Sequence, residues 1–168
     1  MKSMFVVLLF MVMCRSLSGW AVSSLYDAEA AVVLKSGVPC FYVPYPISNT
    51  PSIYSDGQGV QLDVFSNSVA TPGYVWRAWR KNRPAVLPLS PESCIPYGTM
   101  SKEWVGQPSV ALLLSTSYEF EMGGELGRYG LFFCILRDKR GEKYLSRSDH
   151  KGTCSSEPLI PVPSSIQR

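Results

Sequence analysis

The placement of the cysteines constrains this 168-residue chain more than any other feature of its sequence. Cys40, Cys94, Cys134 and Cys154 lie at least twenty residues apart and form no CxxC pair, which argues against a zinc site. A fifth cysteine lies near the N-terminus, in a different context. The chain has a single histidine, His150, which excludes metal sites that need two or more imidazoles.

The N-terminal segment has the pattern of an export signal. Residues 4–13 (MFVVLLFMVM) form an unbroken apolar run between Lys2 and Arg15. A membrane-spanning helix needs about 20 apolar residues, so this run is too short to span. A basic start followed by a short apolar core is typical of a secretory signal peptide. We therefore expect residues 1–21 to direct export.

Two processing routes remain open for this segment. One is conventional cleavage after Ala21, which would use the small residues Gly19 and Ala21. The other is lipoprotein processing, in which Cys14 is acylated and becomes the first residue. Cys14 directly follows the apolar run, although Met13 replaces the small residue that usually precedes a lipid-bearing cysteine. Arg15 at the next position favours sorting of a lipidated form to the outer membrane.

By either route the mature chain keeps four cysteines. An even number of cysteines in an exported domain indicates disulfide bonds, and we expect two. Each would stabilise the fold by about 2–4 kcal/mol. Four cysteines allow three pairings, and their spacing does not choose among them.

Short apolar and aromatic segments, separated by proline and glycine, make up most of the mature chain. Apolar and polar residues alternate in residues 60–65 (VQLDVF) and 118–122 (YEFEM), which predicts strands with one solvent-exposed face. No 3.6-residue periodicity extends over eleven or more residues. The segments expected to form strands are residues 30–34, 40–43, 60–65, 74–80, 110–122, 128–137 and 142–146.

This pattern predicts an all-β fold: an antiparallel β-sandwich of about seven or eight short strands, stabilised by disulfides. Residues 22–156 would form one domain, and the Pro- and Ser-rich residues 157–168 a loose C-terminal tail. A chain of this size buries close to 70% of its extended-chain surface on folding, which is enough for an independent core.

Candidates for catalysis are few. Glu119 and Glu121 alternate on one strand face, and Ser148, Asp149 and His150 are sequence neighbours in a polar segment. Glycoside hydrolases use paired carboxylates, and catalytic triads bring residues together from separate elements. The simpler interpretations are a solvent-exposed strand face and a polar turn. We predict no catalytic residue, no metal, no cofactor and no small-molecule substrate, and hence not an enzyme.

Residues 76–83 (WRAWRKNR) combine two tryptophans with four cations. Tryptophan and arginine dominate protein-interface hot spots, so Trp76, Trp79, Arg80 and Arg83 are candidate partner-binding residues. The alternative is a core tryptophan beside an edge strand that its charges protect from aggregation. Trp76 and Trp79 face opposite sides of a strand, so at most one of them belongs to the core. A formal net charge of only +3 in an exported chain argues against nucleic-acid binding.

Several segments, taken in order, resemble one known family. The most specific is residues 89–98 (LSPESCIPYG), and the others are spaced cysteines and aromatic residues. Together they are similar to the type VI secretion immunity periplasmic lipoproteins of Gram-negative bacteria. The resemblance spans about residues 33–154. The residues that carry it are 37–41 (GVPCF), Trp76, 89–98, Tyr118, Tyr129, 133–134 and 152–154.

The resemblance implies a periplasmic protein that binds a toxic effector protein and neutralises it. It maps the family's lipid-attachment cysteine onto Cys14, which would anchor the chain to the outer membrane. It maps the family's four other cysteines onto the four of the mature chain. Pairing nearest neighbours in sequence then gives Cys40–Cys94 and Cys134–Cys154.

Two other functions remain open. One is a periplasmic binding or inhibitor module for another target, such as a cell-wall hydrolase. The other is a small secreted hydrolase that uses Glu119, Glu121 or His150. Alanine at those three positions separates the classes, because protection of cells that survives all three changes argues against an enzyme.

Overall fold

A computed structural model of the protein describes residues 26–47, 59–68, 72–80, 87–124 and 127–160. The expected signal segment with Cys14, and also Arg83, lie outside the described residues. Within those ranges no helix is long and apolar enough to cross a membrane. The strands are β1 (Ala28–Glu29), β2 (Ala31–Lys35), β3 (Val38–Tyr42), β4 (Val60–Ser66), β5 (Gly73–Arg80), β6 (Ile95–Pro96), β7 (Trp104–Gln107), β8 (Ser117–Gly124), β9 (Tyr129–Arg137), β10 (Lys143–Ser148) and β11 (Cys154–Pro158).

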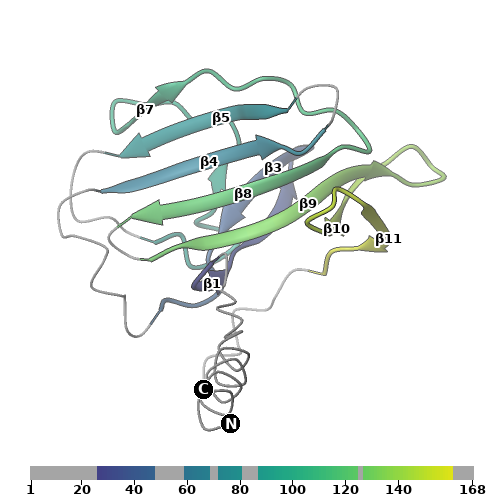
Figure 1. Cartoon of the computed structure of the whole chain (residues 1–168), viewed down its shortest axis with the longest axis horizontal. Helices are drawn as coiled ribbons and strands as arrows, with labels where there is room; N and C mark the ends of the chain where they lie inside the picture. Colours follow the sequence, from purple (N-terminus) through teal and green to yellow (C-terminus); the bar gives the residue numbers. More distant parts are fainter. Residues whose placement is uncertain (1–25, 48–58, 69–71, 81–86, 125–126, 161–168) are drawn as a thin grey trace, which may run out of the picture.

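Eight strands form one large sheet in the order β11-β10-β9-β8-β4-β5-β7, with β1 beside β9 (Figure 1). The neighbours along this path pair antiparallel, and the short β1 pairs with β9 in parallel. Alternation sets the two faces: Leu62 and Val64 of β4 are buried, and so are Phe120 and Met122 of β8. The residues between them point to the opposite side, which we call the outer face.

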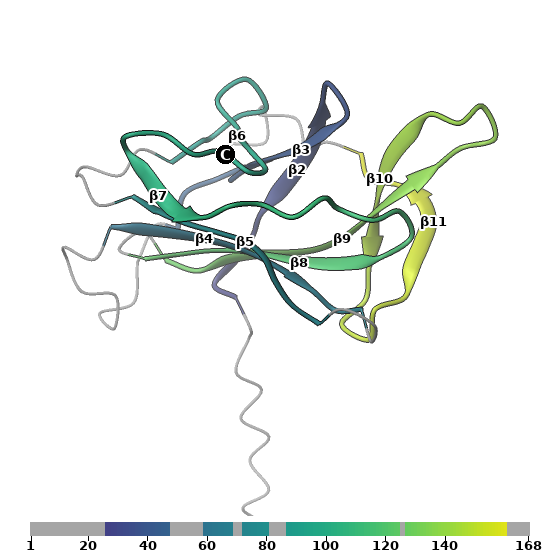
Figure 2. The ribbon, with the colours of Figure 1, turned by 90° about the horizontal axis from the view of Figure 1, so that it is seen from above.

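The second sheet, β2-β3-β6, covers the buried side of the large sheet (Figure 2). Its β2–β3 hairpin closes through Ser36 and Gly37, which both have positive φ, 50° and 75°. Two such residues match the primed turn whose twist suits a hairpin, and glycine adopts this backbone without strain. The chain passes between the sheets at Ala30, because β1 belongs to the large sheet and β2 to the second.

Aromatic side chains from both sheets share one core. Phe41 of β3 stacks on Phe120 of β8, with ring centroids 4.0 Å apart. The ring of Phe133 of β9 meets that of Phe41 edge-on, with centroids 5.6 Å apart. The ring of Trp76 of β5 lies with its centroid 6.5 Å from that of Phe41. The sheets therefore pack face to face, and the predicted all-β, disulfide-stabilised antiparallel sandwich is confirmed.

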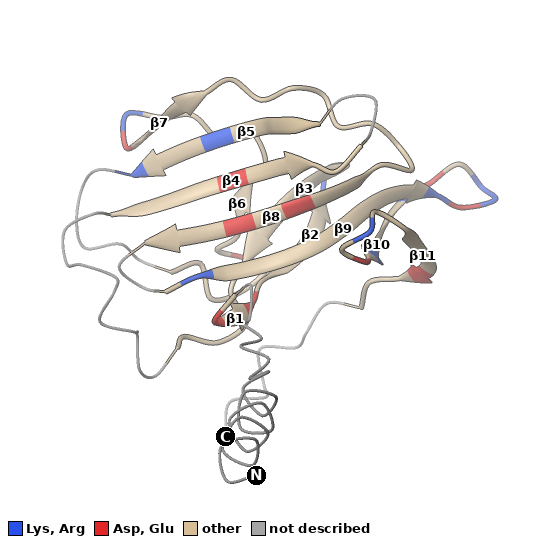
Figure 3. Ribbon diagram, in the orientation of Figure 1, with Lys and Arg blue, Asp and Glu red and all other residues tan. Residues whose placement is uncertain are grey.

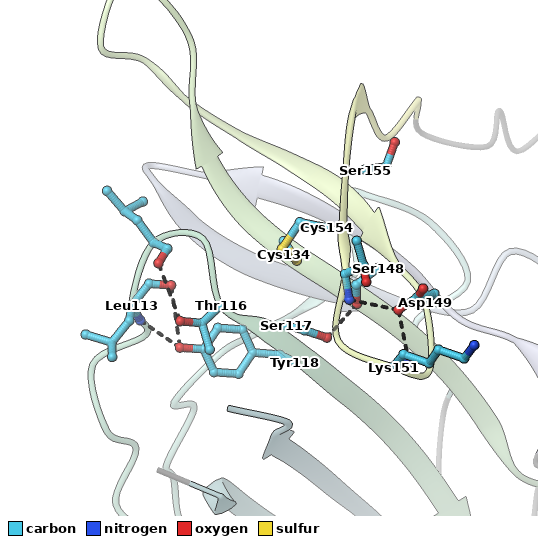
Figure 4. Close-up of a disulfide and its surroundings, with 12 residues drawn as sticks. Leu113, Thr116, Ser117, Tyr118, Cys134, Ser148, Asp149, Lys151, Cys154 and Ser155 are labelled. Atoms are coloured by element: carbon cyan, nitrogen blue, oxygen red, sulfur yellow. Dashed lines mark hydrogen bonds between the residues drawn. A yellow bond between two sulfur atoms is a disulfide. The ribbon is translucent and has the colours of Figure 1, made fainter. Parts of the chain in front are cut away.

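Both predicted disulfide pairings are confirmed. Cys40 of β3 bonds to Cys94 in the turn before β6, with Cα atoms 5.4 Å apart. Cys134 of β9 bonds to Cys154, the first residue of β11, with a Cα separation of 5.9 Å (Figure 4). Both separations are usual for disulfides. Each bond therefore ties together strands that are distant in sequence.

The predicted strand over residues 110–122 is wrong in its first half, because β8 begins only at Ser117. At Ser115 the backbone turns through a positive φ of 56°, which interrupts an extended strand. The peptide groups of residues 110 and 113 instead bond to Val75 and to the hydroxyls of Tyr97 and Tyr118. The predicted domain end at residue 156 also falls short, since β11 continues to Pro158 and Leu159 bonds to Leu145.

Candidate binding face of the large sheet

The outer face of the large sheet gathers charged side chains from four strands. The alternation that buries Leu62 and Phe120 leaves Asp63 of β4 and Glu119 and Glu121 of β8 on this face. Basic positions lie on β5 and at the start of β9, on either side of these acidic ones (Figure 3). Asp63 and Glu121 lie directly opposite each other in the β4–β8 ladder. Like charges at such a position repel unless cations balance them.

Two ion pairs supply that balance. Arg77 of β5 donates from Nε to Asp63 Oδ1 at 2.9 Å, and Arg128 donates from Nε to Glu121 Oε1 at 3.0 Å. Both pairs are partly exposed, where an ion pair contributes about 0–1 kcal/mol. The hydrogen bond to Asp63 is the main cause that raises the pKa of Arg77. These pairs contribute little stability, but they set the direction of the side chains that a partner would meet.

Tyr26 closes one part of the outer face. Its ring lies over Gly130 of β9, where an added Cβ would meet ring carbons at 2.2 Å, so only glycine leaves room for it. Its hydroxyl donates a hydrogen bond to Glu119. Burial is the first cause that raises the pKa of Tyr26, followed by the Glu119 hydrogen bond and the charges of Glu119 and Glu121. Tyr26 therefore stays a neutral donor.

Aromatic rings are exposed on the β5 side of the outer face. Trp79 keeps 40% of its surface exposed, and Tyr74 is exposed as well. The Arg77 guanidinium stacks over the Tyr74 ring at 4.0 Å, and Phe65 meets that ring edge-on at 5.4 Å. Rings held in this way lose little freedom when a partner covers them.

The four predicted partner-binding residues do not lie together. Trp76 is only 1% exposed and packs in the core, so its assignment to an interface is wrong. Arg80 shares the side of Trp76, and its guanidinium forms a 2.7 Å ion pair with Glu103. Arg83 lies outside the described residues. Trp79 is the member of the set that the structure places on the exposed face.

Sequence reasoning missed Arg77, which lies beside Trp79 on the outer face. The signal was present, because residues two apart in a strand share a face whereas neighbours and residues three apart do not. Arg77 also lies directly opposite Asp63 in the β4–β5 register, so the two side chains share the outer face. Arg128 and Tyr26 had no such signal, because their places depend on contacts between segments distant in sequence.

The remaining catalytic candidates are engaged in local structure. Ser148 bonds to Ser117 at 2.7 Å, whereas Asp149 accepts backbone hydrogen bonds from Lys151 and Thr153 in an exposed turn (Figure 4). The hydrogen bond from the Thr153 backbone is the first cause that lowers the pKa of Asp149. No group of acidic, histidine or cysteine residues within the described ranges could hold a metal ion.

The outer face is shallow. One hollow, beside Asp63, Glu121 and Arg128, has a volume of about 260 Å³. A second, beside Tyr26 and Phe132, has about 380 Å³, and both are open to solvent rather than enclosed. Small-molecule pockets usually measure about 300–1,000 Å³ and enclose most of the ligand. An open face of this size is better suited to side chains of a macromolecular partner.

The segment with the most specific family resemblance, residues 89–98, builds structure away from the outer face. Its Ser90 and Ser93 form a tight turn, and Cys94 then bonds to Cys40. The Tyr97 hydroxyl lies 2.9 Å from the carbonyl oxygen of Val75 and 2.6 Å from that of Val110. Burial raises the pKa of this hydroxyl, which keeps it protonated. Tyr97 thus ties the segment before β8 to the edge of β5.

Replacing Tyr97 with phenylalanine should lower the free energy of unfolding by about 1 kcal/mol, because the single hydroxyl proton shared between the Val75 and Val110 carbonyls is lost, while Val75 O keeps the Val110 amide as a donor. Urea denaturation measures the change. Tyr144→Phe is the matched control, since that hydroxyl contacts a carbonyl at 3.4 Å in an exposed place. Equal losses in the two variants would show that the Tyr97 bridge contributes nothing specific.

The fold and this face define a class: a disulfide-stabilised β-sandwich with an open, charged and aromatic sheet face. No family model matches the chain, and comparisons with curated proteins and with solved structures find no match. A functional assignment therefore depends on the chain's own residues.

Proposed function

We propose that this protein is an immunity protein that binds a toxic effector of type VI secretion in the periplasm and neutralises it. One observation carries the proposal: Trp79 is exposed beside Arg77 on a rigid sheet face. Tryptophan and arginine are the residues most enriched in protein-binding hot spots. The resemblance of residues 89–98 to the immunity lipoproteins suggests that the partner is a toxic effector protein.

The scaffold suits a stoichiometric inhibitor. Disulfides tie β3 to the turn before β6, and β9 to β11, so the sheets lose little freedom on binding. The three carboxylates Asp63, Glu119 and Glu121 form the middle of the outer face. An effector surface with lysine or arginine opposite them complements this charge and associates faster.

The same proposal places the protein at the periplasmic side of the outer membrane. By the lipoprotein route, the signal that ends before Cys14 directs export, and a lipid on Cys14 anchors the protein. Such a position intercepts an effector as it enters the periplasm. Cell fractionation of the wild-type chain and of Cys14→Ser tests the anchor, because loss of the lipid should release the protein into the soluble fraction.

Co-expression with the toxin encoded beside its gene tests the function. Growth should be restored when both proteins reach the periplasm, and continued killing despite a folded, exported chain contradicts the proposal. Glu119→Gln, Glu121→Gln and His150→Asn test the hydrolase alternative, since each removes a group that could act as acid, base or nucleophile while changing the side-chain volume little. An enzyme would be favoured if removing one of these groups abolished both protection and the turnover of a substrate.

Trp79→Ala and Arg77→Ala should each weaken effector binding by about 1–2 kcal/mol, or about 5- to 30-fold in Kd, as hot-spot truncations do. Isothermal titration calorimetry measures the affinities. Tyr45→Ala is the matched control, because Tyr45 is similarly exposed but does not belong to the outer-face strands. Unchanged affinity in both folded variants would place the interface elsewhere.

A further inference from the structure

Large apolar side chains are exposed where the chain approaches β8. Val110 is 58% exposed, Leu113 56% and Leu114 39%. Their neighbour Leu112 packs against the core and fixes the segment in place. Apolar side chains that are exposed together can mark an interaction surface, whereas single ones are ordinary.

The backbone of this segment is bonded on both sides, so the exposed side chains do not belong to a loose loop. The Val110 amide donates to Val75 O at 2.8 Å, and the Leu113 amide donates to the Tyr118 hydroxyl at 2.7 Å (Figure 4). The Ser115 amide donates to Ile135 O at 2.9 Å. This last bond places the segment beside the C-terminal half of β9.

A cluster of cations lies at the C-terminal end of β9 and in the turn that follows it. Arg137, Lys139, Arg140 and Lys143 are all exposed around the β9–β10 turn. Within the described part of the chain none of the four forms a salt bridge. The Asp138 carboxylate is directed into the turn, where it accepts hydrogen bonds from backbone amides. The turn therefore presents an excess of positive charge.

The apolar segment and the cations lie at the same end of the sandwich. Ile135, which bonds to Ser115, is two residues from Arg137. Both views place the segment before β8 and the β9–β10 turn at one end of the large sheet (Figures 1 and 2). We call this surface, formed by Val110, Leu113, Leu114, Arg137, Lys139, Arg140 and Lys143, the basic-apolar end.

We propose that the basic-apolar end docks on an anionic lipid bilayer. Leucine and valine side chains enter the interfacial region, and lysine and arginine attract the phosphate groups of the lipids. Charge complementarity favours lipid as the occupant, because the four cations outnumber the two carboxylates of the same turn, Asp138 and Glu142, by two, and apolar groups lie beside them. Docking through this end leaves the outer face of the large sheet open.

The geometry of the chain allows this docking when Cys14 carries a lipid. Eleven residues separate Cys14 from Tyr26. Fully extended, these residues span roughly 35–40 Å, so the domain stays within reach of the bilayer. The docking does not depend on the lipid or on effector binding, and it can be tested without either.

Vesicle co-sedimentation tests the proposal, with vesicles of phosphatidylglycerol compared with vesicles of phosphatidylcholine. The full chain is used with Cys14→Ser, so that no acyl chain contributes. Lys139→Ser combined with Arg140→Ser should weaken binding to phosphatidylglycerol about 25-fold, because each cation near an anionic surface contributes about fivefold. Leu113→Ser combined with Leu114→Ser should weaken it at least about tenfold.

The control Lys102→Ser, compared with Lys139→Ser alone, removes one charge from the other end of the large sheet, since Lys102 precedes β7, whose Trp104 pairs with Arg80 at the end of β5. It should change binding less than about twofold. Binding that is equal in all variants would assign the attraction to the shared N-terminal run and overturn the proposal. Equal affinity for both lipids would also overturn it. So would a dimer, seen by light scattering, that the leucine pair abolishes, because it would make a second copy the occupant.

Discussion

Replacing Cys40 and Cys94 together by alanine is expected to lower the free energy of unfolding by about 4 kcal/mol, the largest effect of any paired substitution discussed for this chain. The disulfide closes a loop of 54 residues, and loop-closure entropy of that length corresponds to about 4 kcal/mol. Cys40 is fully buried beside Tyr42, so the lost sulfur also leaves unfilled space. Urea denaturation without reductant measures the change.

The second disulfide is the internal control. Cys134–Cys154 closes a loop of 20 residues, for which the same relation gives about 3 kcal/mol. Cys134→Ala with Cys154→Ala should therefore cost less than the first pair. A larger loss at the second pair would show that local packing of β11, rather than loop length, determines the contribution. Such a result would contradict the entropic account of both bonds.

The cysteine pattern and the alternation of residues predicted most of the large sheet. Residues 60–65, 74–80 and 128–137 each lie within a strand or differ from one by a residue or two. These segments carry their own signal, since the alternation of residues 60–65 and the apolar and aromatic composition of the other two belong to the sequence itself. The two-residue strands β1 and β6 carry no such signal, because they exist only where β9 and β3 supply hydrogen bonds.

The failures have a common physical cause. The apolar sequence of residues 110–114 favours a strand, but its amides and carbonyls bond to tyrosine hydroxyls that come from other elements. Trp76 was placed in an interface because composition does not distinguish the two sides of β5. The second sheet distinguishes them, because Phe41 of β3 packs on the side that Trp76 faces. Tertiary contacts therefore decided what local pattern left open.

The candidate site was predictable in part. Trp79 was identified from composition, whereas its neighbours Arg77 and Asp63 required the strand register as well. The alternation of residues 118–122 indicated a solvent-exposed strand face with Glu119 and Glu121, to which the β4–β8 pairing adds Asp63. It did not indicate that Tyr26 would cover part of this face, since the residue lies 93 positions from Glu119.

Phe41→Ala should lower the free energy of unfolding by about 3–5 kcal/mol, as removal of a buried phenylalanine usually does. Phe41 is the residue through which the second sheet meets Phe120, Phe133 and Trp76 of the large sheet. The loss is thus concentrated at the contact between the layers. If the alanine variant does not fold, Phe41→Leu, with an expected loss of about 1–1.5 kcal/mol, keeps the test measurable.

Val38→Ala on the same strand is the matched control for Phe41, because Val38 is exposed and its truncation should change stability by no more than about 0.5 kcal/mol. A double-mutant cycle with Phe120→Leu isolates the stacked pair, which should couple by about 0.5–1.5 kcal/mol. Zero coupling, or a Phe41→Ala loss as small as that of Val38→Ala, would mean that the sheets are not held together at this ring. The other core side chains of this region, Val32 and Val43, would then carry the contact of the second sheet with the rest of the fold.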